Sequence, residues 1–158
     1  PRNVPDDILR RVTANGGVVM VTFLPAYVSQ AVADDRTVRR EARAAAKRLA
    51  DPAARRRALA ALDARPPPRA TLADVADHIE HIRRIAGIDH VGIGSDFDGM
   101  SSTPLGLEDV SKYPALFAEL ARRGWSDTEL EKLAGRNLLR ALRAAEAAAR
   151  RLQATRPG

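Results

Sequence analysis

The stretch "VGIGSDFDG", from Val91 to Gly99, places two carboxylates just after a short apolar run. Asp96 and Asp98 stand within three positions of each other, and positions 92, 94 and 95 hold only glycine or serine. A carboxylate at the end of a buried strand can take up and release a proton, and small neighbours let a ligand approach the backbone. Aspartates followed by glycine are also common in tight turns, where they accept backbone hydrogen bonds. These residues alone leave both interpretations open.

Two better-known motifs do not fit this stretch. A dinucleotide-binding loop needs a third glycine that is absent at the required spacing, and here acids stand where phosphate would bind. A calcium loop needs its glycine later and a glutamate at the twelfth position, which is Leu107. The acids must therefore be interpreted through the elements that position them.

The surrounding pattern alternates helices with two short apolar runs. The run 18–24 is rich in β-branched residues, as expected of a strand covered on both faces, and Pro25 ends it. A second short strand is predicted at 90–93, directly before the acids. Helix signals, chiefly capping residues, acids in first turns and closing glycines, predict helices at about 4–15, 34–63 (interrupted near 51–52), 71–87, 112–123 and 126–151 (broken near 135).

This order predicts an α/β protein with parallel strands and covering helices. Two strands cannot form a complete sheet of that kind, and a (β/α)8 barrel needs eight strands and about 250 residues. We therefore expect residues 1–158 to be a single partial domain, with a helical insertion at about 30–69. The start at Pro1, on the threshold of a helix, also suggests that an upstream part is missing.

Composition narrows the class of protein further. The 158 residues include 45% hydrophobic and 29% charged residues, which is typical of a soluble globular protein. There is no cysteine, so disulfides and thiolate metal sites are excluded. No apolar run approaches the roughly 20 residues that span a bilayer and no signal peptide is visible, so we expect a cytoplasmic protein. The net charge is +6, and most of the basic residues are arginines. Such an excess of arginine most simply reflects solvated helix faces.

The whole set of phrases resembles the renal (membrane) dipeptidase family of zinc peptidases. The phrases are "RNVPDDILRRV", "GGVVMVTF", "LADVADHIEHIRRIAGIDHVGIGSDFDG", "GLEDVSKYPALFAELARRGWS" and "NLLRALRAAE", in the family's order. The resemblance covers nearly the whole chain except residues 30–69 and the last few. It implies the C-terminal portion of a TIM-like (β/α)8 metallo-hydrolase barrel that cleaves dipeptides, with some tolerance of D-residues at the C-terminal position.

The resemblance also implies roles for three residues. Arg2 corresponds to the arginine that holds the substrate's carboxylate, a task suited to its planar fork of donors. Asp96 corresponds to the catalytic carboxylate that carries a proton from the attacking water to the leaving amine. Tyr27 falls where the family has a substrate-facing tyrosine, although this chain has Thr22 where the family usually has Asn. Asp98 is expected to be a structural residue of the loop.

The resemblance further implies two zinc ions, bridged by a carboxylate, which activate the attacking water. The family's ligands precede the "RNVPDD" phrase, so no zinc ligand is expected in this chain, and His78, His81 and His90 match none of them. We expect the isolated chain to be inactive. Its partners would be a dipeptide substrate, the missing N-terminal half of the barrel, and a second copy in a homodimer of the full enzyme.

Two other function classes compete with this hypothesis. The arginines between Arg36 and Arg57 could form a basic module that binds nucleic acid or an anionic surface. No aromatic residue lies among them, which counts against recognition of single-stranded nucleic acid. The chain could alternatively be a pseudoenzyme that keeps the family's packing and serves as a partner subunit.

Overall fold

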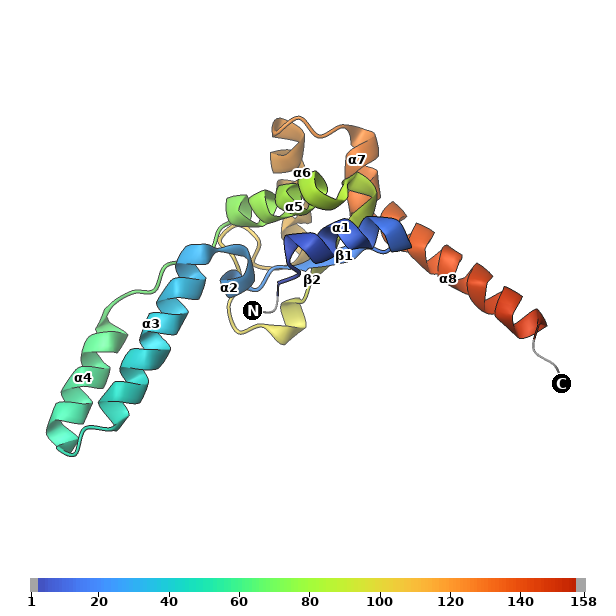
Figure 1. Cartoon of the computed structure of the whole chain (residues 1–158). Helices are drawn as coiled ribbons and strands as arrows, with labels where there is room; N and C mark the ends of the chain where they lie inside the picture. Colours follow the sequence, from blue (N-terminus) through green and yellow to red (C-terminus); the bar gives the residue numbers. More distant parts are fainter. Residues whose placement is uncertain (1–2, 156–158) are drawn as a thin grey trace.

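The computed structural model describes residues 3–155 and has two parallel strands at its centre (Figure 1). β1 (Val19–Thr22) pairs with β2 (Val91–Ser95), and the chain between them passes through four helices. Parallel strands need such a crossover connection. Among the described residues β1 pairs only with β2, so its other edge is open.

The first helix, α1 (Asp6–Asn15), forms where the sequence signals predict it. Pro5 precedes it, and Asp6 and Asp7 in the first turn complement the positive end of the helix dipole. Gly16 ends it with φ of 72°, a left-handed conformation that glycine adopts without steric cost. The turn then delivers the chain into β1.

The central helix, α5 (Leu72–Ala86), joins the sheet to the rest of the core. Thr71 and Asp74 form a complete capping box at its start, because each side chain accepts from the other's backbone N–H. Its buried face packs against both strands and against α1. The buried cluster that results comprises Leu9, Val21, Phe23, Val75, Ala76, Ile79, Ile82, Ala86, Val91, Leu107, Leu116, Leu120, Trp125 and Leu133.

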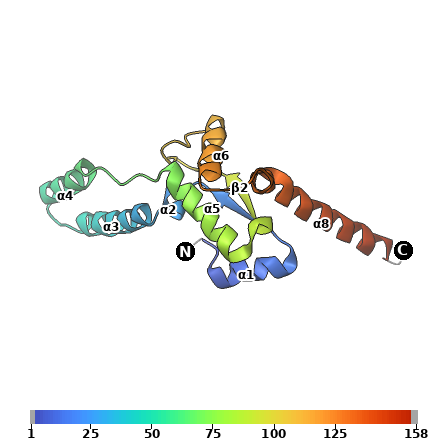
Figure 2. The same cartoon turned by 90° about the horizontal axis from the view of Figure 1, so that it is seen from above.

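Between β1 and α5 the chain makes a short turn and then a protruding helical arm. α2 (Pro25–Val28) turns the chain, and α3 (Gln30–Lys47) and α4 (Pro52–Ala64) form a hairpin that extends away from the sheet in both views (Figures 1 and 2). No residue of α4 is buried. Arg39 holds the two helices together instead, since it bonds Asp35 within α3 and the carbonyl oxygens of Leu62 and Arg65 across the hairpin.

The arm carries the excess positive charge of the protein. Residues 30–69 include eleven arginines and lysines and five acids, which gives +6 and equals the formal charge of the whole chain. The remainder of the chain is therefore balanced. The arm is an electropositive projection on an otherwise neutral body.

The C-terminal half closes the core from the other side of β2. A short turn, η1 (Ile88–His90), leads into β2, and η2 (Phe97–Gly99) and η3 (Val110–Lys112) follow it. α6 (Tyr113–Arg122) and α7 (Asp127–Glu131) then pack near α5, where Arg123 forms ion pairs with Asp77, Glu80 and Glu119. The π-helical turn η4 (Lys132–Arg136) connects α7 to α8 (Asn137–Ala154), which extends away from the body (Figure 2).

The predicted fold class is confirmed: the chain is a helix-rich α/β structure with two parallel strands and has the form of a partial barrel. The predicted interruption at 51–52 and the break at Gly135 both lie where helices meet. The helix α2 was not predicted, because Pro25 was interpreted only as the end of a strand. None of the helices within residues 3–155 is long and apolar enough to cross a membrane.

Asn137 provides a test of how β2 is held. Its buried side chain donates to the carbonyl oxygens of Ile88 and Val91, at 2.6 and 2.9 Å. Asn137→Ala leaves both oxygens without this donor, so we expect the free energy of unfolding to fall by about 2 kcal/mol. Asn15→Ala is the matched control; it removes an exposed bond to Gly17 and should cost less than about 1 kcal/mol. Equal losses in denaturant titrations would contradict this account.

Candidate functional site

The carboxyl ends of the two strands lie level with each other. Val21 pairs with Ile93 but Thr22 pairs with Ser95, so β2 has one extra residue at a bulge. The N–H of Phe23 donates to the carbonyl of Ser95 at 2.8 Å and closes the ladder. The residues that follow β1 and β2 therefore leave the sheet at the same edge, which is where parallel α/β proteins place their chemistry.

The backbone at the end of β2 is strained. Ser95 and Asp96 have φ angles of 49° and 70°, and these are the positive-φ residues other than glycine in the described chain. Such conformations cost of the order of 1 kcal/mol or more and persist only where the surroundings hold them. Here the buried Ser95 hydroxyl is hydrogen-bonded to the Tyr113 hydroxyl. The ring of Tyr113 packs with those of Phe23 and Phe97 beneath the turn.

Asp96 is exposed at this edge and turned by the strained backbone. Its N–H donates to Gly94 O at 2.7 Å, and its carboxylate lies over Gly99, where a Cβ atom would overlap it. A side chain at position 99 would therefore displace the Asp96 carboxylate from its present position. The glycines at 92 and 94 were predicted to let a ligand approach the backbone. In the structure they make space for Met20 of β1 instead, so the close approach there is between the two strands.

Tyr27 lies at the meeting point of three cavities. It belongs to α2, four residues beyond Phe23, and its carbonyl accepts from the Asn3 side chain at 2.8 Å. One cavity it lines also contains Gly99, the residue beneath the Asp96 carboxylate. The structure therefore brings Tyr27 and the Asp96 loop to one region. Arg2, the third predicted residue, lies outside the described residues.

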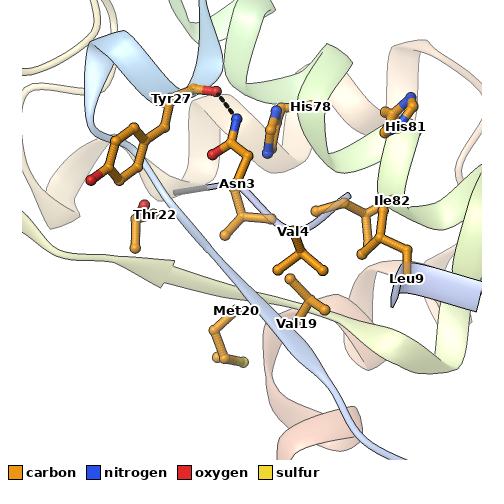
Figure 3. Close-up of a pocket in the computed structure, with 11 residues that line it drawn as sticks. Asn3, Val4, Leu9, Val19, Met20, Thr22, Tyr27, His78, His81 and Ile82 are labelled. Carbon is orange, nitrogen blue, oxygen red and sulfur yellow. Dashed lines mark hydrogen bonds between the residues drawn. The ribbon is translucent and has the colours of Figure 1, made fainter. Parts of the chain in front are cut away.

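The cavity shown in Figure 3 runs along the open edge of β1. Four consecutive strand residues, Val19 to Thr22, line it, although their side chains alternate between the two faces of the sheet. A cavity can touch all four only where it follows the edge of the strand. Its volume is about 250 Å³, and Asn3 and Tyr27 lie at the end near Thr22.

His78 and His81 face this cavity but do not form a metal site. His81 accepts from Arg84 at Nδ1 (2.9 Å), because a guanidinium can only donate, and its Nε2–H donates to Asp6 (2.7 Å). Both ring nitrogens are therefore engaged. Within residues 3–155 no three His, Asp or Glu side chains come together as a metal-binding group. The acid that His81 bonds lies on α1, so the bond joins α5 to α1.

Sequence reasoning missed the residues that support the site. Ser95 was noted only for its small size, and Tyr113 and Asn3 were quoted in the family phrases without a role. Two consecutive left-handed residues have no signal in a Ser-Asp pair, because glycine or asparagine usually marks such positions. The aromatic cluster depends on pairing across the fold and has no local pattern.

The Ser95–Tyr113 bond can be tested by a double-mutant cycle. Tyr113→Phe and Ser95→Ala each remove it and should each lower the free energy of unfolding by about 1 kcal/mol. The loss in the double variant should exceed the larger single loss by at most about 0.5 kcal/mol, because the bond can be lost only once. Additive losses in urea titrations would show that the two hydroxyls do not interact.

His78 predicts a pH dependence of stability. Burial, followed by the neighbouring His81, lowers the pKa of His78 below its ordinary 6.5. The unfolded chain then binds a proton at position 78 more readily than the folded chain. The free energy of unfolding is therefore unaffected by His78 above pH 6.5 and decreases as the pH falls below that value. The lowered pKa values of Asp89 and Glu129 act in a more acidic range. His78→Gln should flatten the slope between pH 6.5 and 5; an unchanged slope would contradict the assignment.

Comparison with known proteins assigns this arrangement to a family. Residues 1–156 match the membrane dipeptidase family, peptidase family M19. An uncharacterized dipeptidase of Schizosaccharomyces pombe is 42% identical over 147 residues, which are 92% of this chain and 27% of the relative. Dipeptidase aclJ of Aspergillus oryzae is 41% identical over 156 residues, 99% of this chain and 29% of the relative. The chain thus spans less than a third of the curated relatives it matches.

Solved structures agree with the sequence comparison. The probable dipeptidase PvdM from Pseudomonas aeruginosa superposes with a TM-score of 0.68 at 31% identity, over 89% of this chain and 40% of that one. A metallo peptidase from Rhodobacter sphaeroides, liganded with a phosphinate mimic of the dipeptide L-Ala-D-Ala, gives 0.59 at 26% identity, over 87% and 30%. With a family match that covers almost every residue and the same partial fold, the chain belongs to the membrane dipeptidase family of metallopeptidases.

Proposed function

We propose that this chain is the closing part of a zinc-dependent dipeptidase, in which it contributes substrate-binding groups and a proton-carrying carboxylate. The observation that carries the proposal is the position of Asp96, at the carboxyl end of a parallel strand and beside the loop that borders Tyr27. The family match supplies the reaction class, which is hydrolysis of a peptide bond between two amino acids. A basic binding module does not explain the strained turn at the end of β2.

Asp96 would handle the proton of the reaction. Hydrolysis needs a group that takes a proton from the attacking water and gives it to the leaving amine. The Asp96 carboxylate is exposed and lies over Gly99, which carries no side chain. The bond between Ser95 and Tyr113 holds the strained turn, and therefore the direction of this side chain. Ser95 and Tyr113 are thus positioning residues.

Tyr27 and Arg2 would bind the dipeptide. Tyr27 lines all three of the cavities that meet near α2, so a ligand in any of them contacts it. The Asn3 side chain donates to the Tyr27 carbonyl and so joins Asn3 to α2 (Figure 3). An arginine next to Asn3 can pair with the dipeptide's terminal carboxylate through two parallel hydrogen bonds.

The described residues of this chain do not fit the two zinc ions on their own, because no group of ligands is assembled among them. We propose that the zinc ligands lie in the part of the relatives outside the match. The open edge of β1 supports this arrangement, since a strand from that part could pair with it. The isolated chain is then expected to be inactive. The predicted cytoplasmic location and homodimer stay predictions.

Complementation tests the proposal. The chain would be co-expressed with the region of the Schizosaccharomyces relative that precedes the matched residues, and hydrolysis of L-Ala-D-Ala would be measured with added zinc. We expect activity only when both parts are present. Asp96→Asn should lower kcat by about 10²–10⁴-fold, because it removes the proton carrier.

Asp98→Asn is the matched control, because Asp98 is an exposed aspartate two residues further along the same turn. It should change kcat less than threefold. Activity of the lone chain with zinc would contradict the placement of the ligands outside it. A full rate in Asp96→Asn would contradict the proton-carrying role, whatever the partner requirement.

A further inference from the structure

The proposed site has a cationic wall that none of its assigned residues explains. Arg36, on α3, lines two of the cavities that Tyr27 lines: one with Arg40 and Asn3, and one with the loop at residues 99–102. Arg36 thus stands between the Tyr27 region and the segment that follows Asp96. The cavity with Arg40 has a volume of about 540 Å³.

The two guanidinium groups on this wall are unpaired. Within residues 3–155, neither Arg36 nor Arg40 makes a hydrogen bond or an ion pair, whereas Arg39 and Arg43 of the same helix are paired with Asp35 and Asp63. Three and four residues separate positions on one helix face, so Arg36 and Arg40 project together. The pair is therefore available to a ligand in the cavity that both arginines line.

One acid, Asp34, also lines the cavity, and it is already engaged. Its carboxylate accepts from the Gln30 side chain at 2.7 Å. Two unpaired cations therefore face one carboxylate that is held by its own neighbour, and the wall remains net positive. A second carboxylate from outside would complete the pairing, since a guanidinium presents forked donors that match a carboxylate.

We propose that Arg36, assisted by Arg40, is a subsite for an acidic side chain of the substrate, so that the chain favours dipeptides with aspartate or glutamate. The inference rests on the proposed function, because it uses Tyr27 as a substrate contact. Arg2 takes the terminal carboxylate in that proposal, and Arg36 is a separate cation on α3. We place the acidic side chain on the C-terminal residue, where it branches next to that carboxylate.

A binding experiment on the 158-residue chain tests this subsite, because all its residues lie in the chain. Gly-Asp and Gly-Asn, each with the second residue in its L and its D form, would be titrated into the protein. The arginine side-chain N–H signals would be followed by NMR. These peptides differ by one charge at nearly the same shape. An exposed ion pair contributes modestly, so we expect Gly-Asp to bind about fivefold more tightly and to shift the Arg36 signal.

Arg36→Gln should abolish the fivefold preference, and Arg36→Lys should retain part of it by keeping the charge. Arg56→Gln is the matched control, since Arg56 is an exposed arginine of the same arm that lines none of these three cavities, and it should keep the preference. Equal affinity for the two peptides, absence of binding by either, or a preference that survives Arg36→Gln would overturn the proposal.

The outcome is separable from that of the proposed function. Hydrolysis of neutral dipeptides by the complemented enzyme, without an advantage for acidic ones, would support the dipeptidase and reject the subsite. A charge-dependent preference at Arg36, together with no hydrolysis by the complemented protein, would support the subsite and reject the dipeptidase.

Discussion

The pairing of β1 with β2 is the constraint on which the rest of this structure depends. The ladder fixes which residues leave the sheet together, and the bulge before Ser95 adjusts the level at which they leave. Because Phe23 donates to Ser95, the aromatic ring that follows β1 lies under the turn that follows β2. α5 covers one face of the pair and joins it to α1 and α6. This short contact brings the residues that follow the two strands, among them Asp96 and Phe23, to one edge of the sheet.

The sequence predicted the elements well because their signals are local. The capping box at Thr71, the glycine that ends α1 and the break at Gly135 each depend on a few adjacent residues, and each lies where predicted. The candidate site was predictable for Asp96 and Tyr27, which the structure brings to one region. Arg2 lies outside the described residues, so its place stays a prediction.

The rest of the site could not be predicted from local patterns. Left-handed backbone at Ser95 follows from a bond to Tyr113, eighteen residues away, and an aromatic cluster with Phe23. Asn3 contacts α2 only because the fold brings the two together. Arg36 was interpreted as one of the solvated arginines. It lines two cavities together with Tyr27 because α3 begins directly after the turn at α2. Such features arise from tertiary packing, which overrides local preference.

The uneven distribution of charge has a consequence for how copies of this chain behave in solution. The body is neutral as a whole and exposes an unpaired strand edge, a combination that favours edge-to-edge association. The arm extends the full excess of +6 away from that body (Figure 1). When two chains approach each other, their positively charged arms repel. This long-range repulsion opposes contact between the sheet edges until salt screens it. The same helices that border the candidate subsite thus act as a colloidal stabiliser for the sheet they protrude from.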